Sequence, residues 1–301
     1  MKLKFIAITL AVSALAACSP SKKEKVTDDG SISARTPETE NLLAHLKKVS
    51  SRGFMFGHHD DTNYGIGWEG DEGCSDVKSV CGDYPAVISF DLGHLELGDT
   101  LSLDKVPFSK IRREILNQYK RGGLSSLSWH LRNPLTGGDS WDVSDTTVVK
   151  SILPGGVHHE KFAGWVSKVS AFINSLQTED GVKVPVLFRP WHEHTGSWFW
   201  WGEKLCTPEE YKALWHMTVD ILRGDGVDNA LYAYSPGGEP QDTAQYLKRY
   251  PGDDLIDVIG FDTYQFDRPS YLANVGKSLA IVDSIGRTHD KVIAITETGY
   301  E

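Results

Sequence analysis

The 301-residue chain has few cysteines, no excess of basic residues and no long apolar segment. Its four cysteines form no CxxC motif and no Cys/His spacing of the kind that binds zinc. Lys and Arg total 31 against 41 Asp and Glu, and this net charge of -10 argues against a nucleic-acid partner, which needs a basic face. No GxGxxG or Walker motif follows a predicted strand, so a nucleotide-binding sheet is not indicated. We therefore expect no metal, no cofactor, and a neutral or cationic ligand.

The main apolar run is short and lies at the N-terminus. FIAITLAVSALAA, 13 residues, follows the basic start MKLK and is too short to span a bilayer. It is typical of a secretory signal. The sequence LAAC, Leu15 to Cys18, resembles a bacterial lipoprotein cleavage site. We predict a lipoprotein signal peptide at 1–17, lipidation of Cys18, and a flexible polar tether at 18–36; the alternative is an ordinary signal peptide with a chance cysteine.

A lipidated Cys18 predicts a protein anchored to a lipid bilayer. The residues that follow Cys18 are basic rather than acidic. In Bacteroides-like bacteria an acidic run at this place tends to mark export to the surface. We therefore expect an outer-membrane anchor facing the periplasm, with the cell surface as the alternative.

The rest of the chain alternates short apolar runs with helical patterns. The runs are β-branched or aromatic and too continuous for half-exposed strands, which is typical of buried parallel strands. They occupy residues 53–59, 84–91, 123–130, 182–194, 229–236, 256–264 and 291–299. Helical patterns occupy 108–123, 159–176 and 207–224, the last with Thr207 as N-cap, Pro208 at N1 and Glu210 at N3.

This alternation predicts an α/β fold, a (β/α)8 TIM barrel, over residues 37–301. We count seven strands before Glu301. The expectation is therefore a catalytic barrel that is incomplete at its C-terminus, with the eighth strand missing from this chain.

Polar residues stand where the predicted strands end, the place where active sites gather in such barrels. Because burial of a polar group must be compensated by partners, these positions predict one shared polar site. They are His58-His59-Asp60, Asp91, Trp129-His130, His192-Glu193-His194, Asp262 with Tyr264, and Glu297.

Two carboxylates among these residues suit glycoside hydrolysis. Glu193 ends the fourth strand and Glu297 the seventh, so a closed barrel places them across its mouth. Carboxyl groups roughly 5 to 5.5 Å apart act as acid/base and nucleophile in a retaining reaction. The alternative is that each glutamate is a structural ion-pair partner, for example of Arg189.

Aromatic side chains near Glu193 favour a sugar ligand, because Trp rings stack on the apolar faces of sugars. The candidate platforms are Trp68, Trp129, Trp141, Trp198, Trp200 and Trp201. Packing inside the barrel is the alternative for each of them, and Trp198 is the best stacking candidate because a Gly-Ser turn precedes it.

The motifs resemble those of glycoside hydrolase family 26, chiefly β-mannanases. RPWHEHTGSWFWWG (189–202) is similar to the acid/base segment of that family. FGHH, SWHLRNP, YSPGG, FDTYQ and ITETGY are similar to its other strand-end motifs, in the expected order over roughly residues 40–301. The resemblance implies a barrel whose acid/base ends strand 4 and whose nucleophile ends strand 7.

Carried over by position, the resemblance implies Glu193 as acid/base and Glu297 as nucleophile of a retaining β-1,4-mannanase acting on mannan, glucomannan or galactomannan. Tyr264 would position the nucleophile, His192 would bond the nucleophile or the substrate, and Trp198 would stack on a mannosyl ring. The other expected substrate contacts are His58, His59, Trp68, Trp129 and His130, with Arg189 and Asp262 as structural support.

Several alternatives stay open. The same family contains enzymes for mixed-linkage glucan and β-1,3-xylan, and a non-catalytic glycan-binding lipoprotein would keep the tryptophans without needing both glutamates. A metal-dependent hydrolase would use His58-His59-Asp60 and His192-x-His194 as ligands. Cys74 and Cys81 are close enough in sequence for a disulfide. We expect a monomer.

Overall fold

The computed structural model describes residues 35–300. The predicted signal peptide, Cys18 and the tether up to residue 34 lie outside these residues. No helix in the described part of the chain is both long and apolar enough to cross a membrane.

The centre of the fold is a parallel seven-stranded sheet in the order β1-β4-β5-β6-β7-β8-β9. Its strands are β1 (Gly57–His59), β4 (Val87–Asp91), β5 (Leu124–Ser128), β6 (Val186–Arg189), β7 (Ala230–Tyr234), β8 (Val258–Gln265) and β9 (Val292–Tyr300). Each falls on one of the seven apolar runs or extends it by one residue, so the strand prediction is confirmed. A small antiparallel pair, β2 (Tyr64–Gly65) and β3 (Trp68–Glu69), was not predicted.

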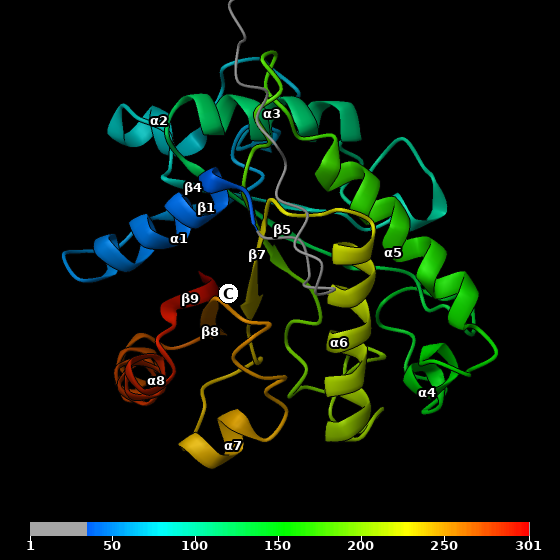
Figure 1. The fold of residues 1–301 in the computed structure, drawn as a ribbon. Coiled ribbons are helices and arrows are strands. Elements are labelled where there is room, and N and C mark those ends of the chain that lie inside the picture. The colour runs from blue at the N-terminus through cyan, green and yellow to red at the C-terminus, as the bar shows by residue number, and fades with distance from the viewer. Residues whose placement is uncertain (1–34, 301) are drawn as a thin grey trace, which may run out of the picture. The chain divides into compact units, whose positions relative to one another are not determined.

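Helices lie outside the strands (Figure 1). They are α1 (Pro37–Ser50), α2 (Asp76–Cys81), α3 (Phe108–Lys120), α4 (Val148–Ile152), α5 (His159–Asn174), α6 (Pro208–Gly224), α7 (Thr243–Leu247) and α8 (Arg268–His289), with a short 3-10 helix, η1, at Leu95–Leu97. The prediction is confirmed for α3, α5 and α6. The capping box of α6 is complete, with the Thr207 hydroxyl accepting from the Glu210 amide and the Glu210 carboxylate accepting from the Thr207 amide.

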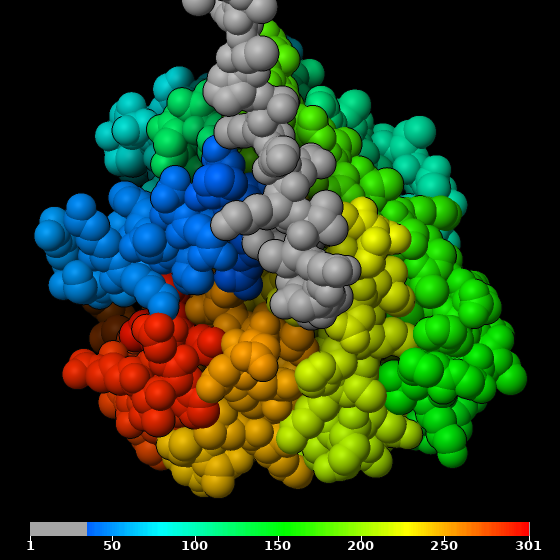
Figure 2. Space-filling view, in the orientation of Figure 1, coloured from blue at the N-terminus to red at the C-terminus, as the bar shows by residue number. Residues whose placement is uncertain are grey.

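The amino ends of the strands are closed by α1. Leu46 of this helix is buried, and Leu42 and Leu43 pack beside it against Leu124 and Leu187 at the start of the strands. The Lys47 ammonium lies 2.6 Å from the Asp290 carboxylate, which brings α1 next to the turn before β9. Figure 2 shows these blue and red segments side by side on one face. Since α1 covers this end, the carboxyl ends of the strands are left for a site.

The sheet of the described residues is bounded by β1 and β9, each paired on one side only. What is established is thus a parallel α/β sheet with helices outside it. The eighth strand stays a prediction, because it concerns sequence outside the described residues.

The cysteines of the described residues are free thiols. The Cys81 thiol donates to the Asp83 carbonyl at 3.4 Å, and Cys206 lies buried beside Arg249, whose guanidinium is 2.9 Å from its sulfur. The disulfide between Cys74 and Cys81 that the spacing suggested is therefore not formed.

Candidate active site

Glu193 lies just beyond the end of β6, in a turn with unusual backbone geometry. Both Trp191 and Glu193 have left-handed φ angles, 56° and 54°. This region costs a non-glycine residue of order 1–3 kcal/mol and is found mostly where function requires it. The Glu193 amide donates to the Ser235 carbonyl at 2.8 Å, which ties this turn to the end of β7.

Trp198 holds the Glu193 carboxylate directly. Its indole Nε1 donates to Glu193 Oε2 at 2.7 Å, and the ring stays 45% exposed. Two glycines make room for this pair. A Cβ at Gly237 would lie 3.0 Å from Glu193 Cβ and 3.1 Å from the Trp198 ring, and a Cβ at Gly196 would meet that ring at 2.3 Å. The glycines of the SPGG and TGSW motifs are therefore needed for close approach to the site.

Glu297 lies on β9, and its neighbour across the strand pair is Asp262 of β8. A register shift between Phe261 and Asp262 precedes this pairing. The Glu297 carboxylate accepts from Arg189 Nη2 at 2.5 Å and from the Tyr264 hydroxyl. The predicted partnership of Tyr264 with Glu297 is thus present, and Arg189 is a second donor to the same carboxylate.

Arg189 joins the two carboxylates of this strand pair. Its Nη1 lies 2.8 Å from Asp262 Oδ2 and 3.1 Å from the Ser235 hydroxyl, while Nη2 bonds Glu297. The Arg189 side chain is 8% exposed and that of Asp262 is fully buried. The prediction that Arg189 and Asp262 support the site structurally agrees with this buried ion pair.

The two glutamates have opposite shifts of their pKa values. Burial raises the pKa of Glu193, and the nearby charge of Glu297 raises it further. The hydrogen bond from Trp198 lowers this pKa but does not outweigh the two. Burial would also raise the pKa of Glu297, but the charge of Arg189 and the hydrogen bonds from Tyr264 and Arg189 outweigh it, so that this pKa is lowered. One group therefore holds its proton at a pH at which the other is ionised, as acid and nucleophile must.

The aromatic platforms divide into buried and exposed rings. Trp129, Trp200 and Trp201 are fully buried, so the prediction of a stacking surface is wrong for these three. The Trp129 indole donates to the buried Glu96 at 3.1 Å, and Trp201 donates to the His192 carbonyl at 2.8 Å. The exposed rings are Trp141, at 47%, and Trp198.

Trp68, in the hairpin strand β3, is partly buried. Its indole donates to Asp76 at 2.7 Å. It therefore braces the hairpin against α2, and a role in shaping the glycone side stays a prediction.

The histidines are placed differently from what the sequence suggested. His192 is 1% exposed, and its Nε2 lies 3.0 Å from His130 Nε2 rather than on Glu297, so the predicted bond to the nucleophile is not formed. His130 also bonds Asp91 through Nδ1, which leaves neither ring nitrogen free for a sugar. His194 packs on Tyr211 and Tyr234 in the core, and in residues 35–300 neither His192 nor His194 belongs to a group of possible metal ligands.

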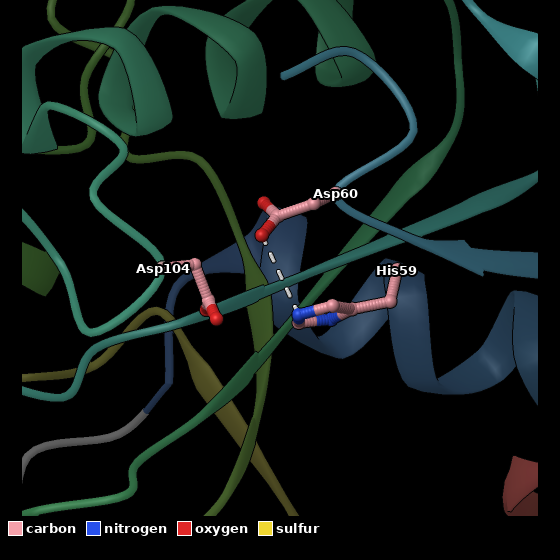
Figure 3. A group of neighbouring side chains, drawn as sticks. All are labelled: His59, Asp60 and Asp104. Atoms are coloured by element: carbon pink, nitrogen blue, oxygen red, sulfur yellow. Dashed lines mark ion pairs between the residues drawn. The ribbon is translucent and has the colours of Figure 1, made fainter. Parts of the chain in front are cut away.

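His58 and His59 stand at the end of β1 with their side chains about half exposed. His59 Nδ1 is 2.8 Å from the Ser89 hydroxyl, and its Nε2 is 3.4 Å from Asp60 (Figure 3). His59, Asp60 and Asp104 each offer one possible metal-ligand atom, and these three atoms lie within 4.8 Å of one another. In residues 35–300 this is the group whose geometry could hold a metal ion.

Replacing Tyr264 by Phe tests the hydrogen bond to Glu297. The variant loses a donor that stabilises the ionised carboxylate, so the pKa of Glu297 rises. Activity then appears only at higher pH, and the acidic limb of kcat/KM moves upward. Hydrogen bonds to charged groups contribute about 1.5–3 kcal/mol, but Glu297 is 36% exposed, so we expect a shift of about one pH unit.

The basic limb provides the internal control for Tyr264→Phe. This limb is set by the pKa of Glu193, which has no hydrogen bond to Tyr264. The basic limb should therefore keep its position on the pH axis while kcat falls. A change in KM alone, with both limbs fixed, would make Tyr264 a substrate contact instead.

The fold and these carboxylates define a class of protein. A parallel α/β sheet that presents one protonated and one ionised glutamate at the carboxyl ends of its strands is typical of a glycosidase. The chain belongs to glycosyl hydrolase family 26, whose family model matches residues 32–297.

Similar proteins agree with this family. A mannan endo-1,4-β-mannosidase from Bifidobacterium adolescentis is 36% identical over 88% of this chain and 27% of its own length, and one from Bacillus subtilis is 27% identical over 88% and 71%. A GH26 β-mannanase structure from Bacteroides ovatus is 60% identical with a TM-score of 0.87, covering 89% of this chain and 78% of that one. An endo-β-1,4-mannanase from Cellulomonas fimi is 36% identical with a TM-score of 0.82, covering 89% and 61%. The chain thus spans between about a quarter and three quarters of the length of these relatives.

Proposed function

We propose that this protein is a retaining glycoside hydrolase that cleaves β-1,4-mannosidic bonds in mannan, glucomannan or galactomannan. The observation that carries the proposal is the opposite tuning of Glu193 and Glu297, with Trp198 on the first and Arg189 with Tyr264 on the second. The names of the similar proteins support mannan as the substrate. The likeness to solved structures of this family supports a (β/α)8 barrel as the proposed fold.

In the first step Glu297 attacks the anomeric carbon while Glu193 gives its proton to the leaving oxygen. The bond from the carbon to that oxygen breaks as the bond to Glu297 forms, which yields a covalent glycosyl-enzyme. Arg189 donates to one oxygen of Glu297 and Tyr264 to the other, so that together they keep Glu297 ionised and fix the orientation of its carboxylate. The raised pKa of Glu193 keeps its proton in place at a pH at which Glu297 is already ionised.

In the second step Glu193, now ionised, takes a proton from water. The water oxygen attacks the anomeric carbon on the face that the leaving group vacated, and Glu297 departs as a carboxylate. Two inversions give a product with the β configuration. Once Glu297 is esterified it no longer carries a charge, so the pKa of Glu193 falls and Glu193 is ionised, as a general base must be.

Trp141 and Trp198 supply the sugar-stacking surfaces in this proposal. They are the two large tryptophan faces that stay about half exposed at the site. Trp198 both stacks and donates to Glu193, so binding of a sugar against its face also excludes water from the acid.

A panel of polysaccharides tests the proposal. The protein should release reducing sugar from mannan and glucomannan and little from mixed-linkage glucan or β-1,3-xylan. Binding of mannan without release would favour a glycan-binding lipoprotein, and faster release from either of the other polymers would reassign the substrate.

We also propose that Cys18 is lipidated and anchors the protein to the outer membrane, facing the periplasm. The support is the order of basic start, apolar run and LAAC motif. Cys18→Ala should move the protein from the membrane pellet to the soluble fraction, because one acyl-modified residue is the proposed attachment. A Cys18→Ala variant that still sediments with membranes would contradict the anchor.

A further inference from the structure

Asp91 and two histidines form a chain of hydrogen bonds near the two glutamates. Asp91 ends β4 and is 2% exposed. Its Oδ2 accepts from His130 Nδ1 at 2.7 Å and from the Ser128 hydroxyl at 2.6 Å, and its Oδ1 accepts from the Gly93 amide at 2.7 Å. These donors keep Asp91 ionised although it is buried.

His130 is linked in the other direction to His192. The two Nε2 atoms are 3.0 Å apart, so one of them donates and the other accepts. Burial, together with the charge of Arg189, lowers the pKa of His192 well below its usual range, so that its ring is neutral. The remaining nitrogen of that ring, Nδ1, is buried without a partner within residues 35–300.

Two features favour a positive charge on His130. Burial alone would lower its pKa, but the Asp91 carboxylate outweighs this and raises it. The Trp141 ring stacks on the imidazole with centroids 5.4 Å apart and planes 10° from parallel, an arrangement that stabilises a cation. The charged or titratable groups that face His130 are Asp91 on β4, Asp104 in the loop before α3, Arg189 on β6, His192 and Glu193 in the turn after β6, and Glu297 on β9.

We propose that Asp91 is a positioning residue that acts through His130: it holds this ring as an imidazolium, and the positive His130 member of the buried Asp91–His130–His192 chain faces both Glu193 and Glu297. The proposal rests on the proposed function. Asp91 touches neither glutamate. His130 accordingly serves the reaction by its charge, since both of its ring nitrogens are bonded inside the protein.

Asp91→Asn tests this role through the pH profile. Without the carboxylate, burial dominates and His130 is neutral at the working pH. The negative charge of Asp91 and the positive charge of His130 are then both lost, and His130 is the one of the two that lowers the pKa values of the glutamates. Both limbs of kcat/KM therefore move to higher pH, by about 0.5–1 pH unit each. This differs from Tyr264→Phe, which moves the acidic limb alone.

Two further variants separate charge from structure. His130→Gln removes the same charge and should move both limbs, and the double variant Asp91→Asn/His130→Gln should shift them no further than either single change. Ser128→Ala removes one neutral hydrogen-bond donor from Asp91 but leaves the charge of Asp91 in place. Both limbs of the kcat/KM profile of this variant should coincide with those of the unmodified protein.

A direct readout does not depend on catalysis. With 15N-labelled histidine, the His130 ring, assigned by its absence in His130→Gln, should carry protons on both nitrogens at pH 7 and on one nitrogen in Asp91→Asn. This spectrum tests the imidazolium even if no mannan is cleaved. A neutral His130 in the unmodified protein, or limbs that stay in place in folded Asp91→Asn and His130→Gln, overturns the proposal.

Discussion

Glu297→Ala should lower turnover on every substrate by about 10^5-fold or more, because it removes the ionised carboxylate that is proposed to form the glycosyl-enzyme. The fold should survive. Arg189 keeps its ion pair with Asp262, and loss of the Glu297 charge removes a repulsion from Glu193 and Asp262. We expect the free energy of unfolding to change by no more than about 1 kcal/mol, since the Glu297 side chain is 36% exposed. Steady-state kinetics and denaturant unfolding on the same preparation give both numbers.

Glu193→Ala is the matched control for this loss. It should spare the first step with an aryl mannoside whose leaving group needs no protonation, so that a burst of phenol precedes slow release of the sugar. Added azide then gives opposite products in the two variants. It should replace the nucleophile in Glu297→Ala and give an α-glycosyl azide, and should attack the intermediate in Glu193→Ala and give the β anomer. The reverse pattern by NMR would exchange the two assigned roles.

The strands and the two glutamates could be predicted because their signals are local. A buried parallel strand is a continuous apolar run, and all seven runs became strands. Glu193 and Glu297 end or follow such runs, and the parallel arrangement brings these ends to one side of the sheet. The capping box of α6 likewise depends only on the four consecutive residues 207–210, and it forms as predicted.

Trp198 was singled out by the Gly-Ser turn before it and is exposed, but the burial of Trp200 and Trp201 could not be predicted, because these residues lie in a turn that has neither strand nor helix periodicity. Neighbouring residues there point in different directions, and tertiary packing left one ring exposed. The hydrogen bond between Asp91 and His130 could not be predicted for a related reason. It depends on the distance between the ends of β4 and β5, and the sequence shows each residue only as a polar residue at the end of a strand.

Arg189→Met should cost the most stability of any single change in the site, about 3–5 kcal/mol at a pH at which Asp262 is ionised, because it leaves a buried carboxylate unpaired. Burial raises the pKa of Asp262 to about 8, and Arg189 is the group that opposes this rise. Without Arg189 the pKa of Asp262 rises further. Because the protonated form folds without penalty, the loss of unfolding free energy should be small below pH 8 and grow as the pH rises above about 8. Urea unfolding at several pH values measures this dependence.

The double variant Arg189→Met/Asp262→Asn decides whether the unpaired charge is the cause. An amide at position 262 can still accept from the Thr296 hydroxyl, which lies 2.6 Å from Asp262 in the unmodified protein, and it carries no charge. The double variant should therefore recover most of the stability that Arg189→Met loses above pH 8, and it should lose the pH dependence. It should remain poorly active, because Glu297 keeps Tyr264 but lacks its second donor and its pKa stays high. If the double variant is no more stable above pH 8 than Arg189→Met, the cost lies in lost packing of the Arg189 side chain rather than in the buried charge of Asp262.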